Sequence, residues 1–146
     1  MRFGEVTGHV LTRFPELEPA FGELRDGLYD GEQPGEYIVV EDLLGVYIEL
    51  LMLRGGERSE QKLADIFRFA EDLLAADDPD AQGVGMLGLL YGRGSAWLRE
   101  AEPFLGPLAR RYLDEYFDGW IDRANAATEE LPPPVDAYGV ASAIAD

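Results

Sequence analysis

The chain of 146 residues has no cysteine, one histidine and one lysine, and it has only three serines and three threonines. Without cysteine there are no disulfides, no thiolate nucleophile and no cysteine-ligated zinc site. The single histidine, His9, rules out histidine-rich metal centres, and it is the one side chain whose ordinary pKa lies near neutrality. No hydroxyl or thiol partner accompanies it in a catalytic pattern, so we expect His9 at a packing edge.

Positive charge is also scarce. Twelve Lys and Arg stand against 29 Asp and Glu, which gives a net charge of −17. A chain this acidic is unsuited to a nucleic-acid backbone or an anionic membrane surface, and it favours a basic protein partner. The many carboxylates and the near absence of lysine have a second interpretation, which needs no basic partner. A salt-rich cytoplasm favours such a composition, because the salt screens the repulsion among the carboxylates.

The chain has enough apolar residues for a packed core, since 47% are hydrophobic and 11% aromatic. Its length predicts one domain over residues 1–124, followed by an Ala- and Pro-rich tail over 125–146. The most apolar window, residues 37–53, holds Glu41, Asp42 and Glu49, which favours a buried central helix over a membrane span. No apolar run follows Met1, so we expect a cytoplasmic protein.

Hydrophobic spacing predicts an all-α fold, a compact bundle of five to seven helices. The expected helices cover 6–14, 17–28, 41–54, 59–76, 79–91, a short stretch around Trp97, and 107–124. The pair 59–76 and 79–91 resembles one helical hairpin of an α-solenoid, in the middle of the chain. Residues 30–35 form a loop, and Tyr37–Val40 is either a short strand or an extended lead-in.

Several residues predict where helices begin and end. Gly55 and Gly56 end the helix over 41–54. Ser59, Asp78 and Ser95 are the expected N-caps, with Pro79 in the first helical position after Asp78. In the helix over 79–91, we expect four side chains to pack inward: Val84, Leu87, Leu90 and Tyr91.

The tail carries three consecutive prolines, which cannot continue a helix. It is either loosely attached or clipped onto the body by its apolar residues, Val135, Tyr138, Val140 and Ile144. The sequence leaves both arrangements open.

Two short motifs match known chemistry but lack its context. Gly83, Gly85 and Gly88 fit a dinucleotide fingerprint, yet no strand precedes them, so we interpret them as small residues that let helices approach closely. Ser59 and Lys62 fit the S-x-x-K pair of penicillin-recognising enzymes, whose other elements are missing here.

Carboxylates recur four residues apart at Asp114, Asp118 and Asp122. The ligand spacing of an EF-hand or a di-iron bundle is absent, so we interpret them as a solvated acidic face. We therefore predict no catalytic residue, no metal, no cofactor and no enzymatic activity.

A candidate partner-binding face combines these acids with aromatic side chains. Its residues are Tyr112, Asp114, Tyr116, Asp118, Trp120 and Asp122. Tyrosine and tryptophan anchor protein interfaces, and the carboxylates suit a basic protein. The same aromatics could instead lie in the core, and a homo-oligomer through this helix stays open.

Three segments carry a family resemblance: Phe14-Pro15-Glu16-Leu17, the run Ile66–Leu74, and Asp77–Gln82 with the Leu87–Leu90 stretch after it. Together they resemble a group of small acidic all-helical bacterial proteins, some of which sit among toxin–immunity proteins. The resemblance implies no catalytic residue. The hypothesis is a small acidic protein-binding module, an immunity-type inhibitor or adaptor. The alternative is a structural or regulatory helical domain whose acidity reflects a high-salt cytoplasm.

Overall fold

The computed structural model of the chain describes residues 1–28 and 32–144, and every regular element in these ranges is helical. The all-α prediction is confirmed. Residues 29–31 of the expected loop region and residues 145–146 of the tail lie outside the described part. The α-helices are α1 (Val6–Arg13), α2 (Glu18–Leu28), α3 (Glu36–Ile38), α4 (Gly45–Arg54), α5 (Glu57–Leu74), α6 (Pro79–Gly83), α7 (Ser95–Ala101), α8 (Pro107–Tyr116) and α9 (Trp120–Ala126).

The remaining helical segments of the described ranges are of other types. They are the 3-10 turns η1 (Phe3–Glu5), η2 (Pro15–Leu17), η5 (Glu102–Phe104) and η6 (Val140–Ala143), and the π-helices η3 (Val39–Leu44) and η4 (Val84–Leu90). No helix in the described ranges is long and apolar enough to cross a membrane.

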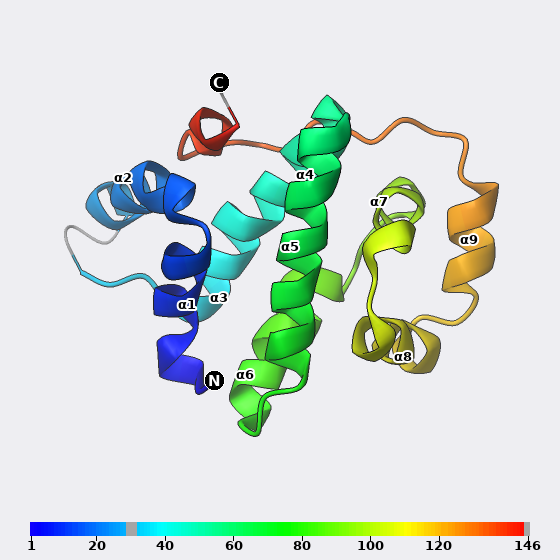
Figure 1. Cartoon of the computed structure of the whole chain (residues 1–146), viewed down its shortest axis with the longest axis horizontal. Helices are drawn as coiled ribbons and strands as arrows, with labels where there is room; N and C mark the ends of the chain where they lie inside the picture. The colour runs from blue at the N-terminus through cyan, green and yellow to red at the C-terminus, as the bar shows by residue number, and fades with distance from the viewer. Residues whose placement is uncertain (29–31, 145–146) are drawn as a thin grey trace.

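Helix α5 runs through the centre of the molecule, with α1 and α2 on one side and α7, α8 and α9 on the other (Figure 1). It packs against α4, α6, η4 and α8, so α5 and the α6–η4 segment form the helical hairpin that the spacing predicts. The buried face of α5 carries Ile66, Phe67, Phe69, Ala70 and Leu73. The apolar stripe of one long helix therefore supplies the middle of the core.

Residues 36–54 form one continuous helical run, α3, η3 and α4, so neither a strand nor an extended lead-in occurs at Tyr37–Val40. The aromatic and β-branched residues of this stretch favour strands locally. Val39 and Val40 are fully buried, however, and η3 packs against η4. Burial in a helical neighbourhood therefore overrides the local preference.

The glycines of the G-x-G-x-x-G motif lie where neighbouring helices come close, which confirms the packing interpretation. A Cβ at Gly88 would lie 3.1 Å from Val40 Cγ1, and one at Gly85 would lie 3.1 Å from Leu73 Cβ. At Gly83 the nearest atom would be the Tyr37 hydroxyl oxygen, at 2.7 Å. A side chain at Gly88 or Gly85 would press η3 or α5 away from η4, and one at Gly83 would displace the Tyr37 hydroxyl.

The prediction that four side chains of the 79–91 segment pack inward is only half right, because η4 is a π-helix. Val84 and Leu90 are fully buried, but Leu87 is 51% exposed and Tyr91 is 70% exposed. The backbone N–H of Tyr91 bonds to the Met86 carbonyl, five residues back. Because a π-helix closes over five residues rather than four, the 3.6-residue spacing assigns Leu87 and Tyr91 to the wrong side.

The expected helix boundaries are partly confirmed. Gly55 ends α4 with a positive φ of 66°, and Asp78 caps α6 by accepting the Asp80 N–H at 2.9 Å. The two serine predictions are wrong: the N-cap of α5 is Gly56, and the N-cap of α7 is Gly94. Ser59 lies two residues inside α5 and is buried.

Carboxylates from distant elements bind the N-terminal ends of helices. Glu71 of α5 accepts the Leu108 and Ala109 N–H groups of α8, both at 2.9 Å. A Cβ at Gly106 would lie 2.4 Å from the Glu71 carboxyl carbon, so only glycine leaves room for this cap. Glu36 accepts the Thr7 N–H of α1 in the same way, at 2.6 Å. Part of the large acid content therefore holds helices together through their positive ends.

Asp78 gives a pH-dependent test of these carboxylate caps. Its pKa is lowered, chiefly by the hydrogen bond from the Phe3 N–H (2.8 Å) and next by that from Asp80. Because its pKa is lower in the folded state, Asp78 stabilises the fold at pH values above its unfolded pKa of about 3.9. This contribution is lost as the pH falls below that value.

Wild type should therefore be more stable than Asp78→Asn at pH 6, and the difference should shrink as the pH falls below about 3.9. Urea unfolding at each pH measures the difference. Asp77→Asn, which removes the same charge from the preceding exposed residue, is the control. A gap between wild type and Asp78→Asn that stays constant over this range would contradict the assignment.

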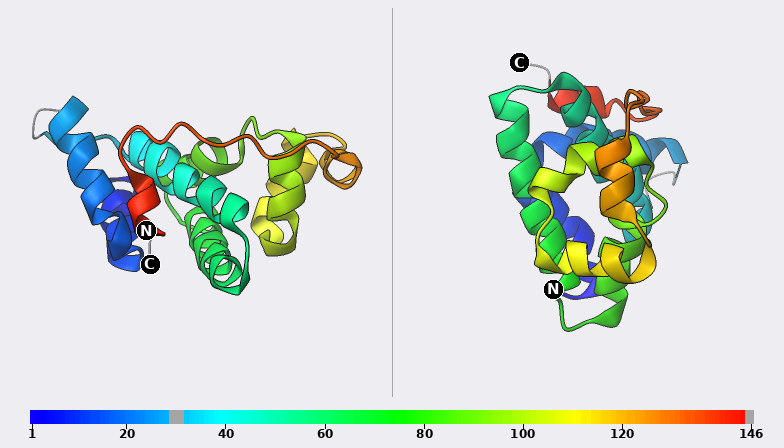
Figure 2. Two further views of the ribbon diagram at one scale, coloured as in Figure 1. Left: turned by 90° about the horizontal axis from the view of Figure 1, so that it is seen from above. Right: turned by 90° about the vertical axis from the view of Figure 1, so that its right-hand side faces the viewer.

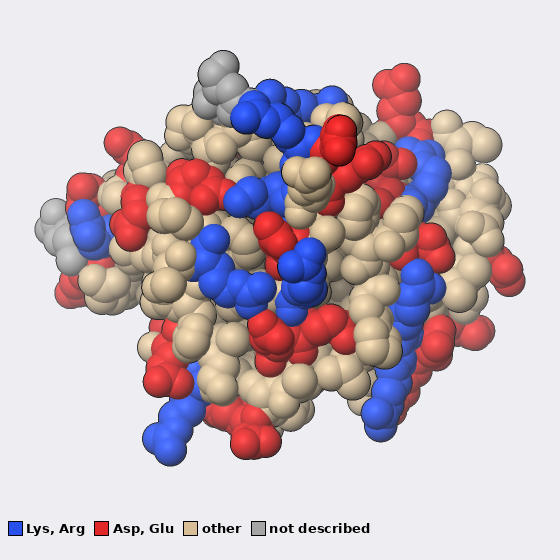
Figure 3. Space-filling view, in the orientation of Figure 1, with Lys and Arg blue, Asp and Glu red and all other residues tan. Residues whose placement is uncertain are grey.

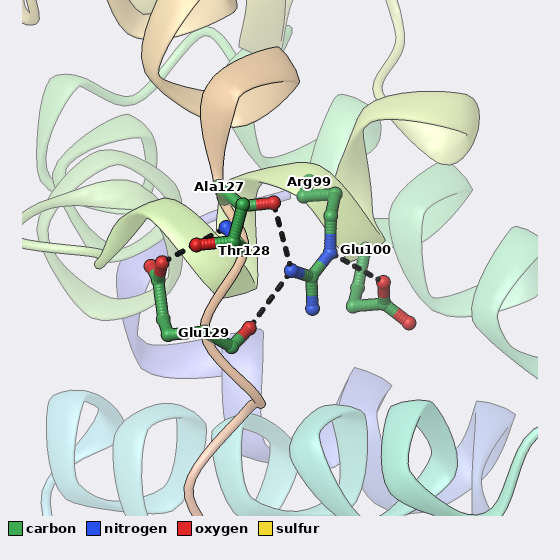
Figure 4. A network of polar contacts seen from close by, with 5 residues as sticks. All are labelled: Arg99, Glu100, Ala127, Thr128 and Glu129. Carbon is green, nitrogen blue, oxygen red and sulfur yellow. Dashed lines mark hydrogen bonds and ion pairs between the residues drawn. The ribbon is translucent and has the colours of Figure 1, made fainter.

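The tail crosses from α9 back to α2 and α4, which Figure 2 shows from above. Near its start, the Arg99 guanidinium Nη1 donates to the carbonyl oxygens of Ala127 (3.3 Å) and Glu129 (2.8 Å) (Figure 4). At its end η6 docks with Val140 fully buried, and Arg54 donates to the Ile144 carbonyl. The clipped arrangement is thus the observed one, but Val135 is 87% exposed and is no part of the clip.

Candidate protein-binding surface

The helix expected to carry the partner-binding face is broken in two. Helix α8 ends at Tyr116, Gly119 adopts a left-handed conformation with φ 72°, and α9 begins at Trp120. The four-residue spacing that predicts Asp114, Asp118 and Asp122 on one helix face therefore does not apply.

Trp120 is a core residue and does not belong to the candidate face. Its side chain is 2% exposed, and its indole Nε1 donates to Asp114 Oδ1 at 2.8 Å. The Arg110 guanidinium lies 5.8 Å from its ring centroid. Tryptophan buries a large apolar surface while keeping one polar atom paired, and that is its role here.

The other five residues do not form one helix face: Tyr112, Asp114 and Tyr116 lie on α8, Asp118 follows it, and Asp122 lies on α9. Within a helix, residues two positions apart point to nearly opposite sides, so Asp114 cannot share a face with both Tyr112 and Tyr116. Asp114, Asp118 and Asp122 instead line one shallow hollow of about 210 Å³ at the corner between α8 and α9. In residues 1–28 and 32–144, no group of three or more acidic or histidine side chains is placed to hold a metal ion.

Tyr112 and Tyr116 form a surface together with Tyr91, a residue whose helical spacing predicts a place in the core. Tyr112 and Tyr116 lie with ring centroids 5.0 Å apart on α8. Tyr91 directly follows η4, which packs against α8. Burial raises the pKa of Tyr112, and Tyr91 and Tyr116 raise it further. We call Tyr91, Tyr112 and Tyr116 the tyrosine surface.

Two members of the tyrosine surface are largely open to solvent. Tyr116 is 66% exposed and Tyr91 is 70% exposed, while Tyr112 is half-buried. Exposed aromatic rings that cluster on one surface are typical of protein interfaces. Helical spacing alone could not find Tyr91, because its position depends on the π-helical register of η4 and on the packing of η4 against α8.

A partly buried ion pair near η4, Arg93 with Glu49, has a structural explanation. Arg93 Nε donates to the Leu89 carbonyl at 2.7 Å, its Nη1 lies 3.3 Å from Glu49 Oε1, and its guanidinium lies 4.8 Å from the Trp97 ring centroid. Burial lowers the pKa of Arg93 and raises that of Glu49, and each charge partly offsets the effect on the other. The guanidinium satisfies a carbonyl at the end of η4.

The S-x-x-K pair does not form a nucleophile and its base. Lys62 Nζ binds Glu16 Oε2 at 2.9 Å and lies 5.7 Å from the Phe14 ring centroid. Burial alone would raise the pKa of Glu16, but hydrogen bonds from Tyr47 and Lys62 leave it lowered. His9 is exposed on α1.

Comparisons of the chain with models of protein families, with curated proteins and with solved structures find no match.

Proposed function

We propose that the chain is a small acidic protein-binding module that receives a basic protein partner on its tyrosine surface. The observation that carries the proposal is the exposure of Tyr91 and Tyr116 on a surface with Tyr112, in a chain that buries both its tryptophans. Tyrosine rings supply broad contact area with little loss of side-chain freedom on binding, and their hydroxyl groups form hydrogen bonds.

The charge of the chain supports a basic partner. A net charge of −17 attracts a cationic protein over several ångströms and speeds its association. At the surface itself, Arg and Lys side chains stack on tyrosine rings through cation–π contact. Glu115, which is exposed on α8 and precedes Tyr116, adds a carboxylate for such a cation.

An immunity-type inhibitor is the form of this function that the chain suits best. Such a protein acts by fast and tight binding to a basic toxin and needs no reactive group of its own. The sequence resemblance to bacterial acidic helical proteins, some of them among toxin–immunity proteins, supports the same proposal.

Site-specific photocrosslinking tests the proposal, because it captures a partner before that partner has been identified. A photoreactive phenylalanine analogue replaces Tyr116 in one variant and Val135, 87% exposed on the tail, in the control. Both are irradiated in extracts of cells that produce the protein naturally, and crosslinked proteins are identified by mass spectrometry.

We expect the variant at position 116 to crosslink one protein of basic isoelectric point that the control does not capture. The same products at both positions, an acidic product, or no product at position 116 would each contradict the proposal.

A further inference from the structure

Three consecutive prolines, at positions 132–134, lie in the tail between α9 and η6. We call residues 131–135 the proline segment. The tail runs along one edge of the molecule, and α8 with Tyr112 and Tyr116 lies at the opposite edge (Figures 1 and 2). An interaction of the proline segment therefore does not rest on the function proposed for the tyrosine surface.

Burial within the proline segment repeats every three residues. Leu131 and Pro134 are half-buried, while Pro132 and Val135 are exposed. A polyproline II helix has three residues per turn, so residues three apart lie on the same edge of it. The first pair therefore faces the body of the protein, and the second pair forms an edge that faces solvent.

The edge that faces solvent is apolar. Val135 is 87% exposed, more than any other large hydrophobic residue in the described ranges, and Pro133 beside it is exposed too. Because proline has no N–H, the prolines offer apolar rings and carbonyl acceptors to a neighbouring molecule and no backbone donor.

The chain is held on both sides of the proline segment. Before it, Arg99 donates to two carbonyl oxygens at the start of the tail. After it, the Asp136 carboxylate accepts the N–H groups of Val140 (2.7 Å) and Ala141 (2.9 Å). A stiff segment that is fixed at both ends loses little conformational freedom when a partner binds it.

The geometry points to a protein partner that binds the proline segment in a groove lined by aromatic side chains. Polyproline II segments are recognised by such grooves, in which tryptophan and tyrosine rings pack on the proline rings. The indole N–H or phenol hydroxyl of the same side chains can donate to the carbonyl oxygens of the segment. The exposed edge of Pro132 and Val135 supplies both kinds of contact.

The charge around the proline segment adds a second property of the partner. Glu129 and Glu130 directly precede the segment and are exposed, and residues 124–146 contain no lysine or arginine. Figure 3 shows Asp and Glu side chains projecting from the edge of the molecule along which the tail leaves α9. A groove with basic side chains beside its aromatic rings therefore complements this segment.

Photocrosslinking from position 135 in the presence of decaproline tests this inference. Decaproline forms a polyproline II helix and competes for an aromatic-lined groove, whereas a Gly-Ser peptide of the same length does not. The variants with the photoreactive residue at position 135 and at position 116 are irradiated in the same extracts, with each peptide at about 1 mM.

We expect position 135 to capture a protein, and decaproline to lower the yield of this product about tenfold or more. The Gly-Ser peptide should leave that yield unchanged. Neither peptide should change the product at position 116, because that product forms at the tyrosine surface.

Variants connect the captured protein to the prolines. With the photoreactive residue at position 135, Pro132→Ser/Pro133→Ser should lower the yield about tenfold. Pro19→Ser, which removes an exposed proline from α2, is the control and should leave it unchanged. The Val140 N–H should exchange as slowly in the double variant as in wild type, because both replaced prolines are exposed and the tail stays docked.

Three results would each overturn the inference: no product at position 135, a product whose yield decaproline leaves unchanged, and equal yields with and without the two serines. Position 116 is measured separately, so the tyrosine surface and the proline segment are tested independently of each other.

Discussion

Replacing Phe67 with alanine is expected to lower the free energy of unfolding by about 3–5 kcal/mol. Phe67 is 1% exposed on α5, its ring lies 5.9 Å from that of Trp97 on α7, and it stacks at 6.2 Å on Phe104 of η5. The alanine would leave a cavity between the central helix and the α7–η5 segment, which a close-packed core fills only in part.

Urea unfolding, followed by tryptophan fluorescence, measures this effect. The indole N–H of Trp97 is buried without a hydrogen-bond partner in the described chain, so a cavity that admits water should also shift the emission to longer wavelength. Tyr116→Ala is the matched control, since this exposed aromatic should cost no more than about 0.5 kcal/mol. A loss below about 1 kcal/mol for Phe67→Ala would contradict the central place of α5 in the core.

The sequence suffices to predict the fold class because amphipathic spacing over long segments is a strong signal. The stripe of α5 from Leu63 to Leu73 predicts both the helix and its buried face, and Asp78 with Pro79 predicts the start of α6. These signals lie within a few neighbouring residues and depend little on the rest of the chain. The packing role of Gly85 and Gly88 is equally local, since it follows from the absence of a strand before them.

Two of the errors come from backbone geometry that departs from a regular α-helix or from the local preference of the sequence. Tyr37–Val40 consists of residues that favour strands, yet it lies in a continuous helical run because Val39 and Val40 are buried against η4. The left-handed conformation at Gly119 breaks the last predicted helix, so the residues before and after it no longer share one helix face. Neither feature follows from hydrophobic periodicity, which assumes regular α-helical turns.

In the candidate site, too, local spacing predicts some features correctly and irregular backbone geometry changes others. The four-residue spacing of Tyr112 and Tyr116 predicts that they lie together, and they do. An unbroken last helix would place Trp120 on the same face, but the helix is broken and Trp120 is buried. Regular α-helical spacing places Tyr91 in the core, but the π-helical register of η4 brings it to the surface near α8.

The double variant Tyr91→Ala/Tyr116→Ala is expected to weaken binding of the basic partner about 100-fold or more, equivalent to about 2.7 kcal/mol. Exposed tyrosines of an interface commonly contribute binding energy of this size, and because both side chains face solvent in the free protein, their removal should barely affect folding. Val135→Ala, which shortens another exposed apolar side chain, should bind like wild type.

The sharpest test of the tyrosine surface is the affinity of the purified partner for wild type and for Tyr91→Ala/Tyr116→Ala, measured together with the melting temperature of each protein. We predict the 100-fold loss of affinity with a melting temperature that changes by no more than about 2 °C. Unchanged affinity in the double variant would show that the partner binds elsewhere and would contradict the tyrosine surface as the binding site.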